Sequence, residues 1–190
     1  EISVLICTWN RALGLEGVLE CFERQTLPRD RFEVILVDNN STDNTREVVT
    51  RFRERATYPL VYLFEGKQGK TWAANTGLAQ ARGEIIACTD HDCHVHPDWL
   101  ERIAKALEDP EVAVVGGPAL SVFPEEVTAD GFRSFLGSRF LGDFSPYDRF
   151  AEVHRRNPPL GMNLAFRREV LRRVGGFDTR LGPAAQKHFG

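Results

Sequence analysis

Short apolar runs alternate with longer amphipathic stretches through the first 117 residues of the chain. The runs, several of them rich in β-branched residues, lie at 2–7, 32–37, 61–64, 85–88 and 112–115. Apolar runs of this length predict buried strands. Between them, apolar side chains recur at helical spacing, most clearly at Leu15, Val18, Leu19 and Phe22, at Val48, Val49 and Phe52, and at Leu100, Ile103 and Leu107.

The repeated strand–helix order predicts an α/β fold with a mostly parallel central sheet, helices on both faces and right-handed crossovers. Two helix starts carry recognisable signals. Asn44, three residues before Glu47, resembles a capping box. Pro97 stands in the first turn of a predicted helix, a position that proline favours.

The pattern is less regular after residue 117. Residues 120–123 are expected to form an extra strand, and 128–147 a helix followed by a mobile loop rich in aromatic residues. Residues 160–166 return to an extended apolar pattern, and 167–174 predict a short helix that a glycine pair ends. No pattern is evident from 181 to 190.

Polar side chains follow three of the predicted strands. Thr8 and Asn10 follow the first, Asp38 the second, and Asp90 and Asp92 the strand at 85–88. An isolated Asp-x-Asp usually caps a turn. The carboxyl ends of parallel strands, however, meet at one edge of the sheet, where ligands bind. Two nearby carboxylates repel unless a cation joins them, and Mg²⁺ takes such ligands together with substrate phosphates. We therefore expect a nucleotide and metal site.

Composition restricts the classes of partner. The chain has 190 residues, 42% of them hydrophobic and 27% charged, with a formal net charge of −3. This charge offers no basic field for nucleic acid, and no apolar stretch reaches the roughly 18 residues of a membrane span. The four cysteines (Cys7, Cys21, Cys88 and Cys93) form no disulfide framework, so a reducing compartment fits. The chain begins with Glu1 rather than Met, and a strand is expected directly after it, as in a domain excised from a longer protein.

Other motifs in the sequence give weaker support for a different kind of site. Gly69-Lys70-Thr71 resembles the end of a P-loop, but Gly66 is too close for that pattern; Lys70 is still a candidate for facing a phosphate. No G-x-G-x-x-G follows the first strand. The histidines, cysteines and aspartates at 88–96 lack the second, separated ligand pair of a structural zinc site, so His94 and His96 are read as loop residues. We expect Trp72 to pack rather than to stack on a base.

Several of these motifs together resemble the family 2 glycosyltransferases. The matching stretches are SVLICTWNR at 3–11, VDNNSTD at 37–43, NTGL at 75–78, ARGE at 81–84, DHD at 90–92, PDWL at 97–100, GMNLAFR at 161–167 and GGFD at 175–178. They cover nearly the whole chain in the family's order. The likeness is specific to the family and not to any substrate.

The resemblance implies a GT-A nucleotide-diphospho-sugar transferase fold in one domain, residues 1–190. Residues 1–117 would be the nucleotide-sugar-binding half and 118–190 a partial acceptor-side half. It implies a nucleotide-sugar donor, expected to be a UDP-sugar, a divalent Mg²⁺ or Mn²⁺, and a single inverting displacement. By position, Thr8, Asn10, Asp38, Lys70, Asp90 and Asp92 would bind the donor, Asp92 with Asp90 the metal, and Asn163 would lie on the acceptor side.

Two departures leave alternatives open. His91 stands where the family often has Asp, and no Glu-Asp pair, in which the family's catalytic base lies, follows 175–178 before Gly190. The base is then expected beyond this chain, with Asp178 a weak candidate that a turn role explains as well. The alternatives are a non-catalytic nucleotide-sugar-binding module and, below it, a nucleotidyltransferase. The acceptor is a saccharide, a lipid-linked or another hydroxyl compound, and the location cytoplasmic, including the face of a membrane reached through regions outside this chain.

Overall fold

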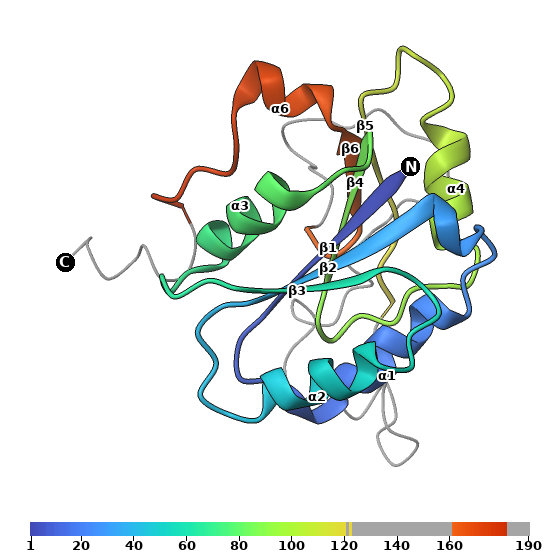
Figure 1. The fold of residues 1–190 in the computed structure, drawn as a ribbon. Coiled ribbons are helices and arrows are strands. Elements are labelled where there is room, and N and C mark those ends of the chain that lie inside the picture. Colours follow the sequence, from blue (N-terminus) through green and yellow to red (C-terminus); the bar gives the residue numbers. More distant parts are fainter. Residues whose placement is uncertain (121, 123–160, 182–190) are drawn as a thin grey trace, which may run out of the picture.

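A six-stranded mixed sheet forms the centre of the part of the chain that the computed structural model describes, residues 1–120, 122 and 161–181 (Figure 1). The strand order is β3-β2-β1-β4-β6-β5. The strands are β1 (Ile2–Thr8), β2 (Phe32–Asp38), β3 (Leu60–Phe64), β4 (Ile85–Asp90), β5 (Val114–Gly116) and β6 (Leu164–Arg167). Strands β3, β2, β1 and β4 pair in parallel, and β6 runs antiparallel between β4 and β5. The mostly parallel α/β sheet is confirmed.

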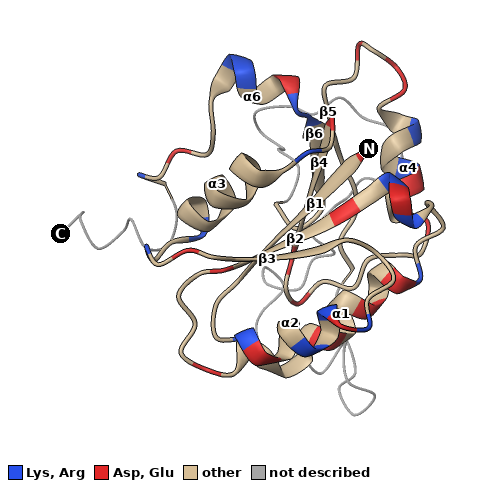
Figure 2. Ribbon diagram, viewed as in Figure 1, with Lys and Arg blue, Asp and Glu red and all other residues tan. Residues whose placement is uncertain are grey.

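Helices cover both faces of this sheet, as predicted (Figure 1). One face carries α1 (Ala12–Glu23), α2 (Thr45–Arg53) and α4 (Trp99–Ala106), and the other α3 (Lys70–Gln80) and α6 (Glu169–Val174). A 3₁₀ turn, Arg29–Arg31, precedes β2. Charged residues gather on the helices and loops, while β1 and β3 carry none (Figure 2). None of the helices in these described ranges has the length and apolarity needed to cross a membrane.

The strands read as unbroken apolar runs because both of their faces are buried. In β1, Val4 and Ile6 pack into the core under α1, α2 and α4, and Leu5 packs into the second core under α3. Successive side chains of a strand point to opposite faces. The position of a residue in its strand therefore determines the face of the sheet to which its side chain points. For the polar residues at the strand ends, this determines which helices lie nearby.

Helix starts differ from the sequence prediction. Asn44 precedes α2 but makes no side-chain capping bond, so the predicted capping box is wrong. The cap comes from Asp43, whose Oδ1 accepts from the Thr45 backbone N–H at 3.1 Å and from its hydroxyl at 2.5 Å. Helix α4 begins two residues after Pro97. Helix α1 is kinked near its start at Leu13 and Gly14, where Gly14 has φ of +87°.

The later part of the chain is only partly described. The predicted helix and loop at 128–147 and the tail after 181 lie outside the described residues. So do two residues of the strand expected at 120–123; Leu120 and Val122 are described and are not in a strand. The extended segment expected at 160–166 corresponds to β6, and the short helix to α6. Strand β6 joins the same sheet as the N-terminal strands, so both ends of the described chain share one core.

Candidate functional site

Three strand ends meet at the carboxyl edge of the sheet. Thr8 ends β1 and pairs in register with Asp38, the last residue of β2, while Asp90 ends β4 and pairs with Cys7. The chain passes from β1 to β2 and β3 on one side and later to β4 on the other, so the strand order reverses between β1 and β4. Ligands of open α/β sheets bind at such a switch point. The predicted convergence of these residues is confirmed, and their roles stay predictions.

Asp38 is held in place by its neighbours. Its side chain is buried, Oδ1 accepts a hydrogen bond from the Ser41 backbone N–H at 2.9 Å, and Oδ2 accepts from the Tyr62 hydroxyl at 2.7 Å. Burial, together with the bond to the Asp38 carboxylate, raises the pKa of Tyr62 above its ordinary value. The phenol therefore remains a hydrogen-bond donor at neutral pH. No sequence pattern signals this partner of Asp38.

Buried polar atoms occur at and next to the carboxyl ends of β1 and β4. Within the described residues, Thr8 Oγ1, Thr89 Oγ1 and His91 Nε2 have no hydrogen-bond partner. His91 Nδ1 lies 3.2 Å from the carbonyl oxygen of Cys7, which requires a proton on Nδ1; in the neutral ring, Nε2 is then an acceptor. Buried polar atoms without partners are costly, and they mark places where a water or a ligand completes the bonding. Thr89 was not among the residues predicted from sequence.

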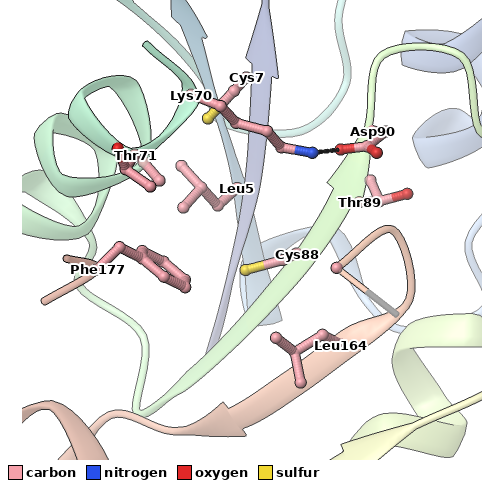
Figure 3. A pocket seen from close by; sticks show the side chains of 11 residues that line it. Leu5, Cys7, Lys70, Thr71, Cys88, Thr89, Asp90, Leu164 and Phe177 are labelled. Carbon is pink, nitrogen blue, oxygen red and sulfur yellow. Dashed lines mark hydrogen bonds and ion pairs between the residues drawn. The ribbon is translucent and has the colours of Figure 1, made fainter. Parts of the chain in front are cut away.

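Asp90 has a different neighbour on the other face. Its Oδ1 contacts the ammonium of Lys70, the first residue of α3, in an ion pair (Figure 3). The pair stands at a cavity of about 230 Å³ between α3 and the sheet. Apolar and thiol side chains form most of its wall: Leu5, Cys7, Ala74, Cys88, Leu164 and Phe177. Lys70 and Asp90 were both predicted site residues, and the structure brings them together.

The two cysteines in this wall are not poised for chemistry. Burial raises the pKa of the Cys7 thiol to about 12 and that of Cys88 to about 12. Both are therefore protonated at neutral pH, and the thiolate is the reactive form. All four cysteines are free thiols. The cavity next to Asp90 is a largely apolar space rather than a nucleophile site.

Asp92 lies two residues after Asp90, in the turn that follows β4. It is exposed, and its Oδ1 lies 3.7 Å from the Cys93 sulfur. No cluster of three or more histidine, cysteine, aspartate or glutamate side chains in the described ranges is arranged to hold a metal ion. Mg²⁺ and Mn²⁺ commonly take one or two carboxylates and complete their coordination with phosphates and water. The carboxylates of Asp90 and Asp92 fit a cation shared with a ligand in this way, and they do not fit a cage built from protein alone.

Loops next to the strand ends are tied to one another. The backbone of Asn10 has φ of +49°, its N–H donates to Ser41 Oγ at 2.8 Å, and its Oδ1 accepts from the Thr42 N–H at 2.7 Å. Asp43 Oδ2 accepts from the Ala12 N–H at 3.1 Å. Asn10 therefore links the β1–α1 loop to the β2–α2 loop. Its predicted contact with a nucleotide stays a prediction.

Asn39 organises the loop that leads to Lys70. This buried side chain donates to the carbonyl oxygens of Glu65 at 3.2 Å and Lys67 at 2.8 Å, and it accepts from the Gly69 N–H at 2.7 Å. The Lys67 ammonium lies 3.4 Å from the centre of the Trp72 ring. Asn39 thus fixes the backbone just before α3, a role that the sequence reasoning missed.

The two later candidates have protein partners of their own. Asn163 Oδ1 accepts from the Trp99 indole N–H at 2.9 Å, and its Nδ2 donates to the Pro118 carbonyl at 2.9 Å. Asp178 forms a fork with Arg180: Oδ2 lies 2.7 Å from Nη2 and Oδ1 lies 3.0 Å from Nε. Hydrogen bonds from Arg180 lower the pKa of Asp178 to about 2. Asp178 is therefore a weak proton acceptor.

Comparison with known sequences gives a consistent picture. Residues 3–175 match the model of the family described as glycosyl transferase family 2. Glycosyltransferase AglE of Haloferax volcanii is 31% identical over 189 residues, which are 99% of this chain and 59% of the relative. The chain thus spans a little over half the length of this relative.

Solved structures agree. The mannosyltransferase PcManGT from Pyrobaculum calidifontis, in complex with GDP-Man and Mn²⁺, superposes with a TM-score of 0.70 at 31% identity, over 95% of this chain and 48% of the other. Staphylococcus aureus TarS 1-349 in complex with UDP gives a TM-score of 0.76 at 21% identity, over 98% of this chain and 53% of the other. The second likeness speaks for the fold alone. Both structures are glycosyltransferases of the GT-A fold.

Proposed function

The chain belongs to glycosyl transferase family 2, and we propose that it binds a nucleoside-diphosphate sugar at the carboxyl edge of its sheet and serves the transfer of the sugar to an acceptor hydroxyl. One observation carries the proposal. The ends of β1, β2 and β4, which carry Thr8, Asp38 and Asp90, lie at one edge of the sheet, at the point where the strand order reverses. With the family assigned, the nucleotidyltransferase alternative is dropped.

In this proposal, residues of β1 and β2 bind one part of the donor, and residues of β4 and α3 bind another. Thr8 and Asp38, with Asn10 in the adjoining loop, take the base and ribose, and Asp90 approaches the ribose from β4. Carboxylate and hydroxyl oxygens can accept hydrogen bonds from the N–H and O–H groups of a nucleoside. The buried Thr8 hydroxyl and His91 Nε2, which have no partner within the described residues, would gain one from the bound nucleoside. Lys70 lies on the phosphate side, where its positive charge attracts the diphosphate.

Asp92 and Asp90 are the residues that would hold Mg²⁺ or Mn²⁺. When bound, a divalent cation neutralises the charge that develops on a leaving diphosphate. The chain's own contribution is to supply two carboxylates as hard oxygen ligands and a lysine in contact with Asp90. The relative solved with GDP-Man and Mn²⁺ supports this choice of group, and both UDP- and GDP-sugars are candidate donors.

The proposal also covers the acceptor. We assign residues 1–117 to donor binding and residues 118–190 to part of an acceptor-side half, with a saccharide, lipid-linked or other hydroxyl compound as acceptor. Transfer in one inverting step needs a carboxylate to take the acceptor proton. The four free thiols favour a reducing, cytoplasmic compartment for this domain.

Calorimetric titration with UDP and with GDP, each in Mn²⁺ and in EDTA, tests the proposal. We expect micromolar to millimolar binding of at least one nucleotide, strengthened by Mn²⁺. Asp92→Ala should remove the strengthening, because it deletes a metal ligand, and Asp38→Ala should weaken binding in both buffers. Asp30→Ala is the matched control, since Asp30 is an exposed carboxylate in the turn before β2, at the opposite edge of the sheet.

Two outcomes would contradict the proposed donor site. No binding of either nucleotide, or equal affinity of the wild-type protein and the Asp92→Ala and Asp38→Ala variants, would sink the donor site. Melting curves of each variant separate lost binding from lost folding.

A second candidate is nucleotide-sugar binding without turnover. It is favoured by Asp178, the late acid of the GGFD stretch, which is locked to Arg180 and is a poor base. Release of nucleoside diphosphate in the presence of acceptors distinguishes the two: a binding module saturates with donor and releases none.

A further inference from the structure

We propose that Lys70 is an exchangeable counter-ion of Asp90. Its ammonium neutralises Asp90 in the free protein and leaves this carboxylate when a diphosphate binds, so that nucleotide and divalent cation bind cooperatively. This inference rests on the proposed donor site and adds to it a route by which the two ligands affect each other. The Lys70–Asp90 ion pair is the observation that carries it (Figure 3).

The lysine is the partner that can move. Asp90 is the last residue of β4, fixed by the parallel ladder with β1, and its side chain is 20% exposed. The backbone before Lys70 is also fixed, because Asn39 Oδ1 holds the Gly69 N–H. The Lys70 side chain, however, is 54% exposed and has a flexible four-carbon stem. Its ammonium can therefore swing away while both backbones stay in place.

The local charges favour such an exchange. Asp90 and Asp92 each carry one negative charge, and among the described residues Lys70 is the cation in contact with either of them. The nearby thiols of Cys7 and Cys88 stay protonated and contribute no charge. A cation that approaches Asp90 must displace the ammonium or share the carboxylate with it. A bound diphosphate, with more negative charge than one carboxylate, draws the ammonium toward itself and frees Asp90.

The exchange predicts that substitution of Lys70 has opposite effects on Mn²⁺ binding and on nucleotide binding. If Lys70 opposes the cation and assists the nucleotide, its removal strengthens Mn²⁺ binding to the free protein and weakens nucleotide binding in EDTA. In the nucleotide complex the ammonium has already left Asp90, so the substitution should leave Mn²⁺ binding to that complex unchanged. The factor by which Mn²⁺ improves nucleotide affinity should then fall, because it equals the ratio of the Mn²⁺ affinities of the nucleotide complex and the free protein. A lysine that merely supports the fold would change both affinities in the same direction.

The experiment uses Lys70→Met, with Lys67→Met as the matched control. Lys67 lies three residues earlier, in the loop before α3, and its ammonium faces the Trp72 ring. Mn²⁺ binding to nucleotide-free protein is followed by electron paramagnetic resonance of the free ion. UDP and GDP are titrated calorimetrically in EDTA and in saturating Mn²⁺, with correction for Mn²⁺ bound by free nucleotide.

We expect Lys70→Met to bind Mn²⁺ about 2- to 5-fold more tightly, an effect of the size that half-exposed ion pairs allow. It should bind nucleotide more weakly in EDTA and show a smaller improvement by Mn²⁺, while Lys67→Met matches the wild type. In an Asp90→Asn background Lys70→Met should have no further effect on Mn²⁺ binding.

Unchanged or weaker Mn²⁺ binding by Lys70→Met, together with an unchanged improvement of nucleotide affinity by Mn²⁺, would overturn the exchange. Lys70→Gln repeats the test should the methionine variant melt early. Absence of any nucleotide binding by the wild-type protein would count against the donor site itself, whereas the Mn²⁺ titration would still decide whether Lys70 opposes a cation at Asp90.

Discussion

The Tyr62 hydroxyl donates a hydrogen bond to Asp38 Oδ2 over 2.7 Å, from the neighbouring strand β3. The other carboxylate oxygen is taken by the Ser41 N–H, so Asp38 is oriented from two sides. A buried carboxylate needs such donors, since burying an unpaired charge is costly. Tyr62 is therefore a positioning residue for Asp38 as well as a member of the sheet.

Tyr62→Phe should lower the free energy of unfolding by about 1–2 kcal/mol, because it removes one hydrogen bond to a charged group. We also expect nucleotide binding to weaken several-fold, although less than in Asp38→Ala, because the carboxylate remains but is no longer fixed. Urea denaturation and calorimetry measure the two effects. Tyr58→Phe is the control: its hydroxyl donates to the Leu19 carbonyl at 2.9 Å, away from the strand ends, so it should cost stability and leave affinity unchanged. Equal nucleotide affinity of Tyr62→Phe and the wild type would reduce Tyr62 to a packing residue.

Gly83→Ala should destabilise the fold by about 2–3 kcal/mol, in the range of an overpacked interior. A Cβ at this position would lie 2.5 Å from the Ser3 backbone nitrogen and 2.8 Å from the Ile2 carbonyl carbon. Backbone atoms of a central strand cannot give way as a flexible side chain can. Gly66→Ala, whose Cβ would meet nothing nearer than a Phe64 ring atom at 3.6 Å, should stay within about 0.5 kcal/mol of the wild type. Similar denaturation midpoints for the two variants would contradict the close approach of residue 83 to β1.

Local patterns explain how much of this architecture could be predicted. The apolar runs that became β1, β2 and β4 are recognisable without knowing their partners, and their parallel order follows from the helices between them. The position of Asp38 and Asp90 at one edge could therefore be inferred before any contact was known. The choice between adjacent capping residues could not, because Asp43 rather than Asn44 has the backbone geometry that reaches the Thr45 N–H.

Contacts between residues distant in sequence could not be predicted from local patterns. Lys70 was recognised only through a near-match to a P-loop, and its contact with Asp90, 20 residues away, depends on how α3 packs against β1 and β2. The insertion of β6 between β4 and β5 is likewise a pairing across more than 70 residues that no short pattern encodes. Tyr62 looked like an ordinary strand aromatic, because its hydroxyl finds Asp38 only after β3 pairs with β2.

Alkaline pH should destabilise the protein through its buried thiols. The pKa of Cys7 and of Cys88 is about 12 in the folded protein against an ordinary value of 9.0, so the folded state keeps protons that the unfolded chain releases. Their contribution to stability is complete below pH 9 and is lost as the pH rises from 9 toward 12. Each thiol should remove about 1.4 kcal/mol per pH unit within this window.

Urea denaturation at pH 8, 9, 10 and 11 measures this slope. The double variant Cys7→Ala/Cys88→Ala should show a shallower fall than the wild type, with the remainder due to other groups such as the buried Tyr58, whose pKa burial also raises. Leu5→Ala, which alters the same cavity without a titratable group, should lower the curve and keep its slope. Parallel pH curves for the double variant and the wild type would show that the thiols do not titrate in this window.

Asp178 should prove dispensable for proton transfer. Its carboxylate is exposed and forked to Arg180, and the resulting pKa of about 2 leaves it ionised and weakly basic throughout the neutral range. General bases work best when their pKa lies near the operating pH, and loss of one typically costs about 10²–10⁴-fold in rate. We expect Asp178→Asn to change the rate of nucleoside diphosphate release by less than about 3-fold, far below the cost of losing a general base. The assay uses a chain that turns over donor, this one or a longer one that contains it, with Arg180→Ala as the control for the turn. A drop of about 100-fold in Asp178→Asn, with donor affinity and melting temperature intact and a pH profile shifted in Arg180→Ala, would instead make Asp178 the base.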